Sequence, residues 1–303
     1  MRTLPFALVG LGFGLGGCVI GSDKYQRPRD LPDEWLVDRV RVLAVQAEPP
    51  EAAPGTRVTF RALVPQPGVV DPYLVVWFTC PPTDDGGIGF GCELPDTSAI
   101  DATDPEALAE LGVIGFEPFQ SPEYTIPDDA LDGLDDAARG EGLYQLVQVT
   151  AFPPSYLEPG GAPEEIDFGE VEAAYKRLVV SEARTPNRNP FLSVFLVDGI
   201  AIPEDATLTV EEGQTYELAT TVSESLVEEY LYLTDDGTEE WRTEEPYVNW
   251  YTTAGTLNES LTLHPYLDVG WVAPESGTSG TFYVVVRDRR GGMAWIQRSF
   301  TVL

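Results

Sequence analysis

The chain has 303 residues, of which 18 are Lys or Arg and 50 are Asp or Glu, so its formal net charge at pH 7 is −32. This charge excludes nucleic acid as a partner, because nucleic-acid capture depends on cationic side chains that displace counterions from phosphates. Hydrophobic residues make up 43% of the chain and aromatic residues 11%. That content is sufficient for packed cores, and the length predicts two domains.

An apolar stretch occupies the start of the chain. It runs over residues 4–15 behind a single cation, Arg2, and is too short to cross a bilayer as a helix. Such a stretch is typical of the hydrophobic region of an export signal. Two glycines then lead directly into Cys18. The order of these residues resembles the lipobox of bacterial lipoproteins.

This resemblance implies cleavage after residue 17, a diacylglycerol on the Cys18 thiol and a further acyl chain on the freed amine. Several acyl chains on one residue hold a protein at a membrane, since each buried methylene contributes about 0.8 kcal/mol. By the same resemblance, Val19 permits sorting to the outer membrane of a Gram-negative bacterium. The alternative is a free cysteine at the end of an uncleaved apolar anchor.

Short segments rich in Val and aromatic residues, with apolar and polar residues alternating and Pro or Gly at their ends, fill most of the remaining chain. These features predict β-strands. The expected strands lie at 40–50, 56–66, 73–81, 143–153, 176–183, 191–199, 207–213, 215–223, 228–244, 247–255, 259–274, 280–288 and 293–303. Two helices are expected, at 104–112 and 127–140, the second beginning at Pro127.

The order of these segments predicts the division of the chain. The composition of TPNRNP (185–190) is typical of a linker. We expect a signal peptide (1–17), a polar tether (18–38), a first β-domain (39–184) with a partly helical insertion at about 93–141, the linker (185–190) and a second β-domain (191–303).

Three features recur in the same order in both expected domains. They are a glycine that opens a strand (Gly55, Gly213), a tryptophan on a later strand (Trp77, Trp250) and a Gly-x-aromatic sequence at another (Gly142-Leu143-Tyr144, Gly280-Thr281-Phe282). The pattern resembles the immunoglobulin-like sandwich superfamily. The resemblance implies two tandem sandwiches, with Trp77 and Trp250 in the cores and Tyr144 loosely at the position of a tyrosine corner.

The final stretch, GTFYVVVRDRRGGMAW, also resembles the last two strands of PKD-type or cadherin-like extracellular modules. Antibody domains carry bridging cysteines where this chain has Leu146 and Val284, so the resemblance implies no disulfide between the sheets. From the alternation itself we expect Trp250 and Trp271 to fill a core between two sheets.

Cys80 and Cys92 flank eleven residues rich in Gly and Pro. An even pair of cysteines in an exported protein predicts a disulfide. A metal site is the alternative, but the chain has a single histidine, His264, far from both cysteines. We expect no cofactor.

The chain offers little chemistry for catalysis. No sequence motif supports a catalytic triad built on His264. With 50 acids, carboxylate pairs come together by chance, so such pairs do not indicate glycoside hydrolysis. We therefore expect that the protein is not an enzyme. Calcium is a candidate ligand for acids in expected loops, although these acids also fit ordinary solvated side chains and none has EF-hand spacing. The acids are Asp84, Asp85, Asp128, Asp129, Asp132, Asp135, Asp136, Asp235 and Asp236.

An expected hairpin between residues 224 and 246 carries nine acids and one base, interleaved with Tyr230, Tyr232 and Trp241. Two interpretations fit it. The hairpin could bind a basic protein or a carbohydrate, or its charges could prevent aggregation between edge strands.

Together these features predict an envelope lipoprotein with a structural, adhesive or ligand-binding role. The expected partners are the membrane, through Cys18, and an envelope protein or glycan. An accessory subunit of a secretion or transport assembly is the alternative, and a hydrolase fits least.

Overall fold

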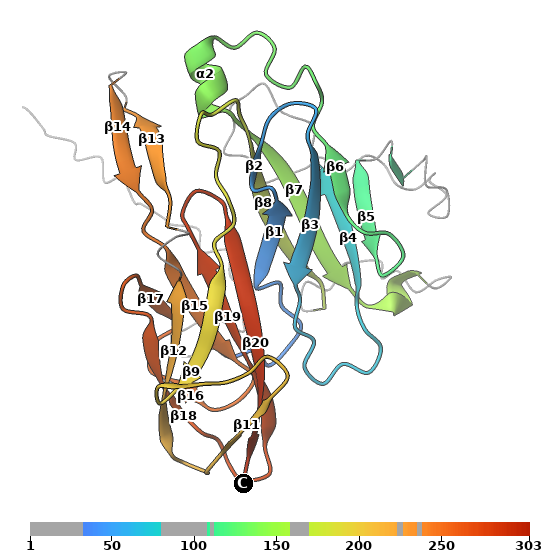
Figure 1. Cartoon of the computed structure of the whole chain (residues 1–303). Helices are drawn as coiled ribbons and strands as arrows, with labels where there is room; N and C mark the ends of the chain where they lie inside the picture. The colour runs from blue at the N-terminus through green and yellow to red at the C-terminus, as the bar shows by residue number, and fades with distance from the viewer. Residues whose placement is uncertain (1–32, 80–107, 110–111, 158–169, 223–226, 235–237) are drawn as a thin grey trace, which may run out of the picture. The chain divides into compact units, whose positions relative to one another are not determined.

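The structure is a computed structural model that describes residues 33–79, 108–109, 112–157, 170–222, 227–234 and 238–303. Residues Glu34–Leu303 form one compact unit. Strands make up almost all of its regular structure (Figure 1). Among the described residues, no helix has the length and apolarity needed to cross a membrane.

Eight strands form the first sandwich in two sheets. One sheet has the order β1-β3-β6 and the other β2-β8-β7-β4-β5, with β2 parallel to β8 and all other neighbours antiparallel. Their bounds are β1 Ala44–Glu48, β2 Glu51–Ala52, β3 Arg57–Leu63, β4 Leu74–Thr79, β5 Val113–Glu117, β6 Glu123–Thr125, β7 Leu143–Phe152 and β8 Glu172–Val180.

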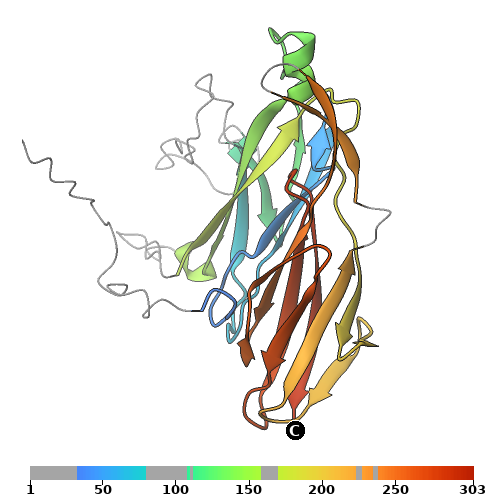
Figure 2. The same ribbon diagram turned by 90° about the vertical axis from the view of Figure 1, so that its left-hand side faces the viewer.

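The second sandwich repeats this arrangement and adds two short strands, β10 and β16. Its sheets have the orders β10-β9-β12-β18-β16 and β11-β20-β19-β15-β17, again with one parallel pair, β11 with β20 (Figure 2). The bounds are β9 Leu192–Val197, β10 Ile200–Ala201, β11 Thr207–Val210, β12 Thr215–Val222, β15 Tyr247–Thr252, β16 Thr256–Leu257, β17 Leu261–Leu263, β18 Asp268–Val272, β19 Ser279–Arg287 and β20 Met293–Val302.

The strand order confirms the expected all-β fold of two immunoglobulin-like sandwiches. In both, the first strand (β1 or β9) lies in one sheet, and a short strand that follows (β2 or β11) joins the other sheet, parallel to its last strand (β8 or β20). The recurring sequence features occupy equivalent places. Gly55 and Gly213 lie two residues before β3 and β12, with φ of +76° and +70°, in the left-handed region that glycine adopts readily.

Two equivalent tryptophans fill the two cores. Trp77 on β4 is 0% exposed and Trp250 on β15 is 1% exposed, which confirms both as core residues. Each indole N–H reaches the neighbouring edge strand: Trp77 donates to Glu117 Oε2 at 3.0 Å and Trp250 to Thr262 Oγ1 at 2.8 Å. The polar atom of each ring is therefore satisfied at the margin of the core.

Aromatic packing continues in the second core. The expected core residue Trp271 is fully buried. Its ring lies edge-on to Phe282 and Phe300, with centroids 4.7 and 4.9 Å away. Tyr144 differs from the resemblance, because its side chain is 67% exposed and lies beside Arg177 instead of closing a corner.

The segment expected as an insertion, 93–141, contributes to the sandwich itself. Residues 113–125 form β5 and β6, which pair with β4 and β3. Each strand is too short for its alternation to stand out in sequence. Residues 80–107, 110 and 111, which include six of the nine residues of the first expected helix, lie outside the described part.

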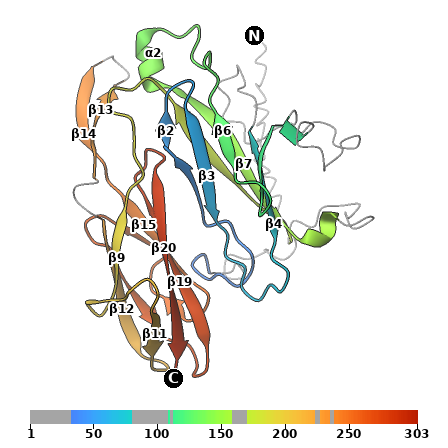
Figure 3. The ribbon, with the colours of Figure 1, turned by 45° about the vertical axis from the view of Figure 1, so that its right-hand side comes forward.

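The second helix is shorter than the range expected from the sequence, 127–140. Helix α2 spans only Asp136–Glu141, since Asp135 caps its start by accepting from the Ala138 N–H at 2.9 Å. Residues 128–133 are turns rather than helix. Figure 3 shows α2 at the end of the first sandwich, where Arg139 pairs with Glu182. A short 3₁₀ helix covers Pro154–Leu157.

A third apolar cluster joins the sandwiches. It consists of Val37, Leu43, Ala44, Leu63, Tyr283 and Val285. Consecutive residues of β19 therefore pack in different clusters: Val284 and Val286 lie in the second core, while Tyr283 and Val285 face the first sandwich. The start of the body also joins the second sandwich, because Val37 N–H donates to Thr252 O at 2.8 Å. Residues 34–38, expected in the tether, thus belong to the body.

We expect Trp77→Ala to lower the free energy of unfolding by about 3–5 kcal/mol, because it opens a large cavity in the first core. Chemical denaturation followed by far-ultraviolet circular dichroism measures this loss. Trp241→Ala is the matched control, since that indole is 66% exposed, and should change stability by about 0.5 kcal/mol or less. Equal losses in the two variants would contradict the assignment of Trp77 to the core.

Candidate functional site

The turn between β19 and β20 carries a charged cluster at the boundary of the sandwiches. Arg290 Nη1 lies 3.1 Å from Glu244 Oε1 and 3.4 Å from Glu228 Oε2, and Nη2 lies 3.3 Å from Glu51 Oε2. Glu51 belongs to β2 of the first sandwich, whereas the other three residues belong to the second half of the chain. We call these four residues the Arg290 cluster.

Neutral groups complete the surroundings of the guanidinium. Arg290 Nη2 donates to the Thr185 carbonyl at 3.1 Å, and the guanidinium carbon lies 4.3 Å from the centre of the Tyr230 ring. Glu244 Oε2 accepts the Glu228 N–H at 3.1 Å. Because Arg290, Glu51 and Glu244 are largely buried, these contacts replace water around the charges.

The segment expected as a linker, 185–190, does connect the sandwiches, but it is packed between them. Asn187 is 2% exposed, and its N–H donates to Glu51 Oε2 at 2.7 Å. Asn189 bonds both sandwiches, with Nδ2 donating to the Ala47 carbonyl at 2.7 Å and Oδ1 accepting the Met293 N–H at 2.9 Å. The composition indicates a connection, while these contacts fix its path.

A buried aspartate shapes the turn that presents Arg290. Asp288 Oδ1 accepts the N–H groups of Arg290 at 2.7 Å and Gly292 at 2.9 Å, and Oδ2 accepts from Asn187 Nδ2 at 2.9 Å. Burial raises the pKa of Asp288 above its ordinary value, and burial likewise raises the pKa of Glu244. The remaining oxygen of Asn187, Oδ1, is buried without a hydrogen-bond partner among the described residues.

Lys176 on β8 is a second buried cation near this turn. It is 3% exposed, and its ammonium donates to the Gly291 carbonyl. Burial lowers its pKa from 10.5 to about 8, partly offset by the charge of Asp288. The first sandwich thus contacts the β19–β20 turn through both Glu51 and Lys176.

The expected hairpin is present as a separate two-stranded sheet, which we call the β13–β14 ribbon. It consists of β13 Glu229–Leu233 and β14 Glu239–Thr243 (Figure 1). The ribbon extends neither sandwich, so its charges do not protect an edge strand of either sandwich. All five residues of β14 are exposed.

The three aromatic candidates of this hairpin do not form one surface. Tyr230 faces Arg290, and Tyr232 lies under Arg242, whose guanidinium carbon is 3.5 Å from the ring centre. Trp241 pairs with Leu231 and alternates with its strand neighbours Glu240 and Arg242, so it lies on the opposite face. Only Trp241 among the three is left largely open to solvent.

Several other expected site residues lie outside the described residues. They are Cys18, Cys80, Cys92, Asp84, Asp85, Asp235 and Asp236. Within the described ranges, no three His, Cys, Asp or Glu side chains come together as a metal site, and this holds for the acids at 128–136. His264 follows β17, and its N–H donates to the Pro246 carbonyl at 3.1 Å.

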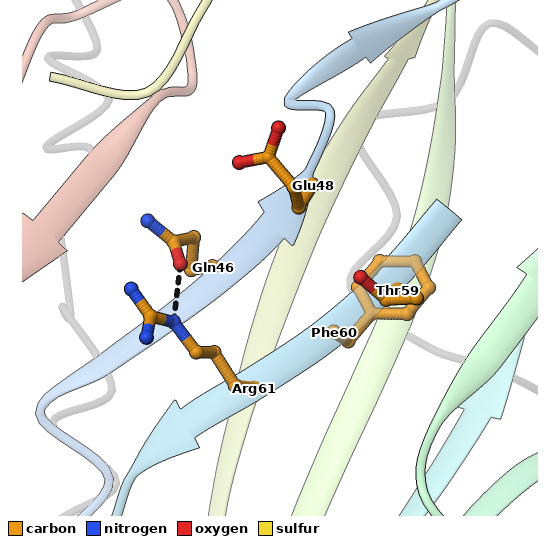
Figure 4. A pocket seen from close by; sticks show the side chains of 5 residues that line it. All are labelled: Gln46, Glu48, Thr59, Phe60 and Arg61. Atoms are coloured by element: carbon orange, nitrogen blue, oxygen red, sulfur yellow. Dashed lines mark hydrogen bonds between the residues drawn. The ribbon is translucent and has the colours of Figure 1, made fainter. Parts of the chain in front are cut away.

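Two hollows lie on the first sandwich. One, of about 260 Å³, lies over β1 and β3 and is shown in Figure 4. Arg61 donates to Gln46 there and also lies 4.6 Å from the ring centre of Trp295, so its cation already has partners. The other hollow, of about 460 Å³, borders Glu51, Ser181 and Asn187 beside the Arg290 cluster.

No protein-family model and no curated protein matches the chain. Among solved structures, 115 chains match. The N-terminal Ig1-2 module of the Drosophila receptor protein tyrosine phosphatase DLAR has 11% identity over 88% of this chain and 99% of its own, with a TM-score of 0.26. The D00-D0 domain of Intimin has 10% identity over 85% and 100%, with a TM-score of 0.23.

Three N-terminal domains of the bacteriophage RB49 Highly Immunogenic Outer Capsid protein match at 11% identity and a TM-score of 0.23. That match covers 87% of this chain but only 59% of the phage chain. At these TM-scores the superpositions support no function. The fold of this chain is defined by its own strand order and cores.

We expect Arg290→Ala to lower the free energy of unfolding by about 3 kcal/mol, because it leaves buried carboxylates without their cation. Chemical denaturation at pH 7 measures the change. Arg188→Ala is the matched control: Arg188 also pairs with Glu228, at 3.2 Å, but its side chain is 78% exposed, so the expected loss is below about 1 kcal/mol. A similar loss of unfolding free energy in both variants would show that burial of the Arg290 cluster does not contribute to stability.

The lowered pKa of Lys176 predicts stability that rises with pH. Between pH 8 and 10.5 the unfolded chain keeps the proton on this amine while the folded chain releases it. The free energy of unfolding should therefore increase by about 3 kcal/mol across this range, and Lys176→Met should abolish this part of the increase.

Denaturation of both proteins at pH 7.5 and 10 measures the difference, and titrations common to both proteins cancel. The sequence has one other lysine, Lys24, so nuclear magnetic resonance of labelled lysine side chains reports the pKa directly. A Lys176 pKa at or above 10 would contradict the prediction.

Proposed function

We propose that this chain is a lipid-anchored, non-catalytic binding protein of a bacterial cell envelope. Cys18 carries the lipid, the outer membrane is its location, and residues 19–33 tether the body. Cys80 and Cys92 form a disulfide that restricts the Gly- and Pro-rich loop between them. The proposal combines the lipobox resemblance with a body built to present a surface.

One observation supports the binding role above the others. The β13–β14 ribbon exposes Trp241 on a strand whose five residues are all exposed, while the base of the ribbon is fixed by Glu228 and Glu244 in the Arg290 cluster. An exposed tryptophan on a fixed support loses little conformational freedom on binding. Such a ribbon is suited to contact a partner.

Replacing the lipidated residue tests the anchoring. We expect Cys18→Ser to move the protein from the membrane fraction to the soluble fraction, because the acyl chains are its proposed attachment. Immunoblotting of separated fractions measures the shift, and Cys92→Ser is the matched control that should stay in the membrane. Mass spectrometry of the native chain before and after reduction reports both the acyl chains and the disulfide. Retention of the Cys18→Ser protein in membranes would refute the anchor.

Capture from the envelope tests the binding role. Tagged full-length chain, cross-linked in cells and extracted in detergent, should retain an envelope protein or a glycan. A stoichiometric set of secretion or transport subunits would identify an accessory role in such an assembly. Capture of neither protein nor glycan would contradict the proposed binding function.

A further inference from the structure

The ladder of the β13–β14 ribbon determines which backbone groups are free. Hydrogen bonds join Glu244 N–H to the Glu228 carbonyl at 3.0 Å and Thr234 N–H to the Thr238 carbonyl at 2.9 Å. In an antiparallel ladder, bonded and non-bonded pairs alternate. The register places Leu231 opposite Trp241, so this pair is of the non-bonded kind.

Three residues of β14 therefore direct their N–H and C=O groups away from β13. They are Glu239, Trp241 and Thr243, all in non-bonded register positions. All three are exposed. In the part of the chain that the structure describes, no hydrogen bond reaches these groups, which leaves this edge of β14 open to another strand.

The other edge of the ribbon is turned toward the body. Leu231 N–H on β13 lies 3.5 Å from Thr185 Oγ1 in the segment between the sandwiches. Figure 1 shows β14 on the outer side of the ribbon. The Arg290 cluster binds both ends of the ribbon base, Glu228 and Glu244. These contacts at the ribbon base therefore fix the position of the open edge of β14.

Side chains along this edge define the chemistry of a partner. Trp241 provides an apolar and cation-binding ring, with Glu239 on the same face and Glu240 on the other. Arg242 is already engaged by Glu240 at 2.8 Å and by the Tyr232 ring. Glu245 lies two residues past the end of β14; its side chain is 78% exposed and pairs with Arg289 at 3.5 Å. The edge combines acidic groups with one exposed ring.

We propose that the open edge of β14 binds an extended, Lys- or Arg-rich segment of another protein by strand addition. Backbone hydrogen bonds supply the pairing, and cations opposite Glu239 and Trp241, which share one face of the ribbon, supply the selectivity. A second copy of this chain is opposed by its own net charge of −32. This inference rests on the proposed binding function and names the partner chemistry of its ribbon.

A synthetic peptide tests the pairing directly. The probe is a nine-residue peptide of alternating Lys and Val, titrated calorimetrically into the full-length chain in detergent at 150 mM salt. The control peptide carries Glu in place of Lys. We expect binding of the basic peptide alone, weakening as salt rises, together with slower hydrogen exchange at the Trp241 and Thr243 amides.

Matched variants separate backbone pairing from charge. Thr243→Pro removes one outward N–H without touching the ladder to β13, while Thr243→Ala keeps it. We expect at least about tenfold weaker binding for Thr243→Pro and little change for Thr243→Ala. Glu239→Lys with Glu240→Lys should also weaken binding about tenfold. Glu204→Lys with Asp205→Lys makes the same charge change at two exposed acids elsewhere and should leave affinity within about twofold.

Circular dichroism melting establishes that each variant is folded. Equal binding of the two peptides, or equal affinity of Thr243→Pro and Thr243→Ala, would overturn strand addition. Concentration-dependent dimerisation in the ultracentrifuge that Thr243→Pro abolishes would identify a second copy as the occupant instead. If Thr243→Pro still captures the envelope partner of the wild type, the binding function stands and this inference fails.

Discussion

Burial of the Arg290 guanidinium among the carboxylates of Glu51, Glu228 and Glu244 fixes three parts of the chain at one point. Glu51 belongs to the first sandwich, Glu228 directly precedes β13, and Glu244 directly follows β14. A buried cation with three acidic neighbours is stable only if every partner stays in place, since loss of one leaves an uncompensated charge. The connection, the ribbon and the boundary between the sandwiches therefore depend on one another.

Apolar packing supports the same boundary. Strand β19 is buried on both faces, with Val284 and Val286 in the second core and Tyr283 and Val285 against Leu43 and Leu63 of the first sandwich. A strand covered on both sides becomes a nearly continuous apolar run, as in its sequence FYVVV. The two immunoglobulin-like units are joined by the packing of β19 against the first sandwich and by the buried Arg290 cluster. These contacts fix the surfaces of the two units relative to each other. A binding ribbon on one unit is thus positioned by both.

The charge of the chain has two different roles in this arrangement. Most acids among the described residues are not buried, and with 50 acids in the chain the body repels anionic surfaces and copies of itself. A few acids are buried and act as acceptors: Asp288 holds the β19–β20 turn, and Glu51 accepts the Asn187 N–H. On β14 the acids stay exposed around Trp241 beside an open strand edge. The acidic residues of this chain thus contribute to solubility, packing or recognition, depending on whether they are buried and on what they contact.

The sequence by itself determined the all-β class, most strand positions and the core roles of Trp77, Trp250 and Trp271, because alternation and large aromatic rings are local signals of a half-buried strand. It also located the β13–β14 hairpin. It did not reveal that residues 113–125 complete the first sandwich, or that Asn187 in the expected linker is buried, since short strands and connections acquire their partners only from distant segments. The Arg290 cluster joins residues 51, 228, 244 and 290, and no periodicity relates them. Only the tertiary structure, which brings these distant side chains within hydrogen-bonding distance, decided which acids are ion-pair partners and which remain surface charge.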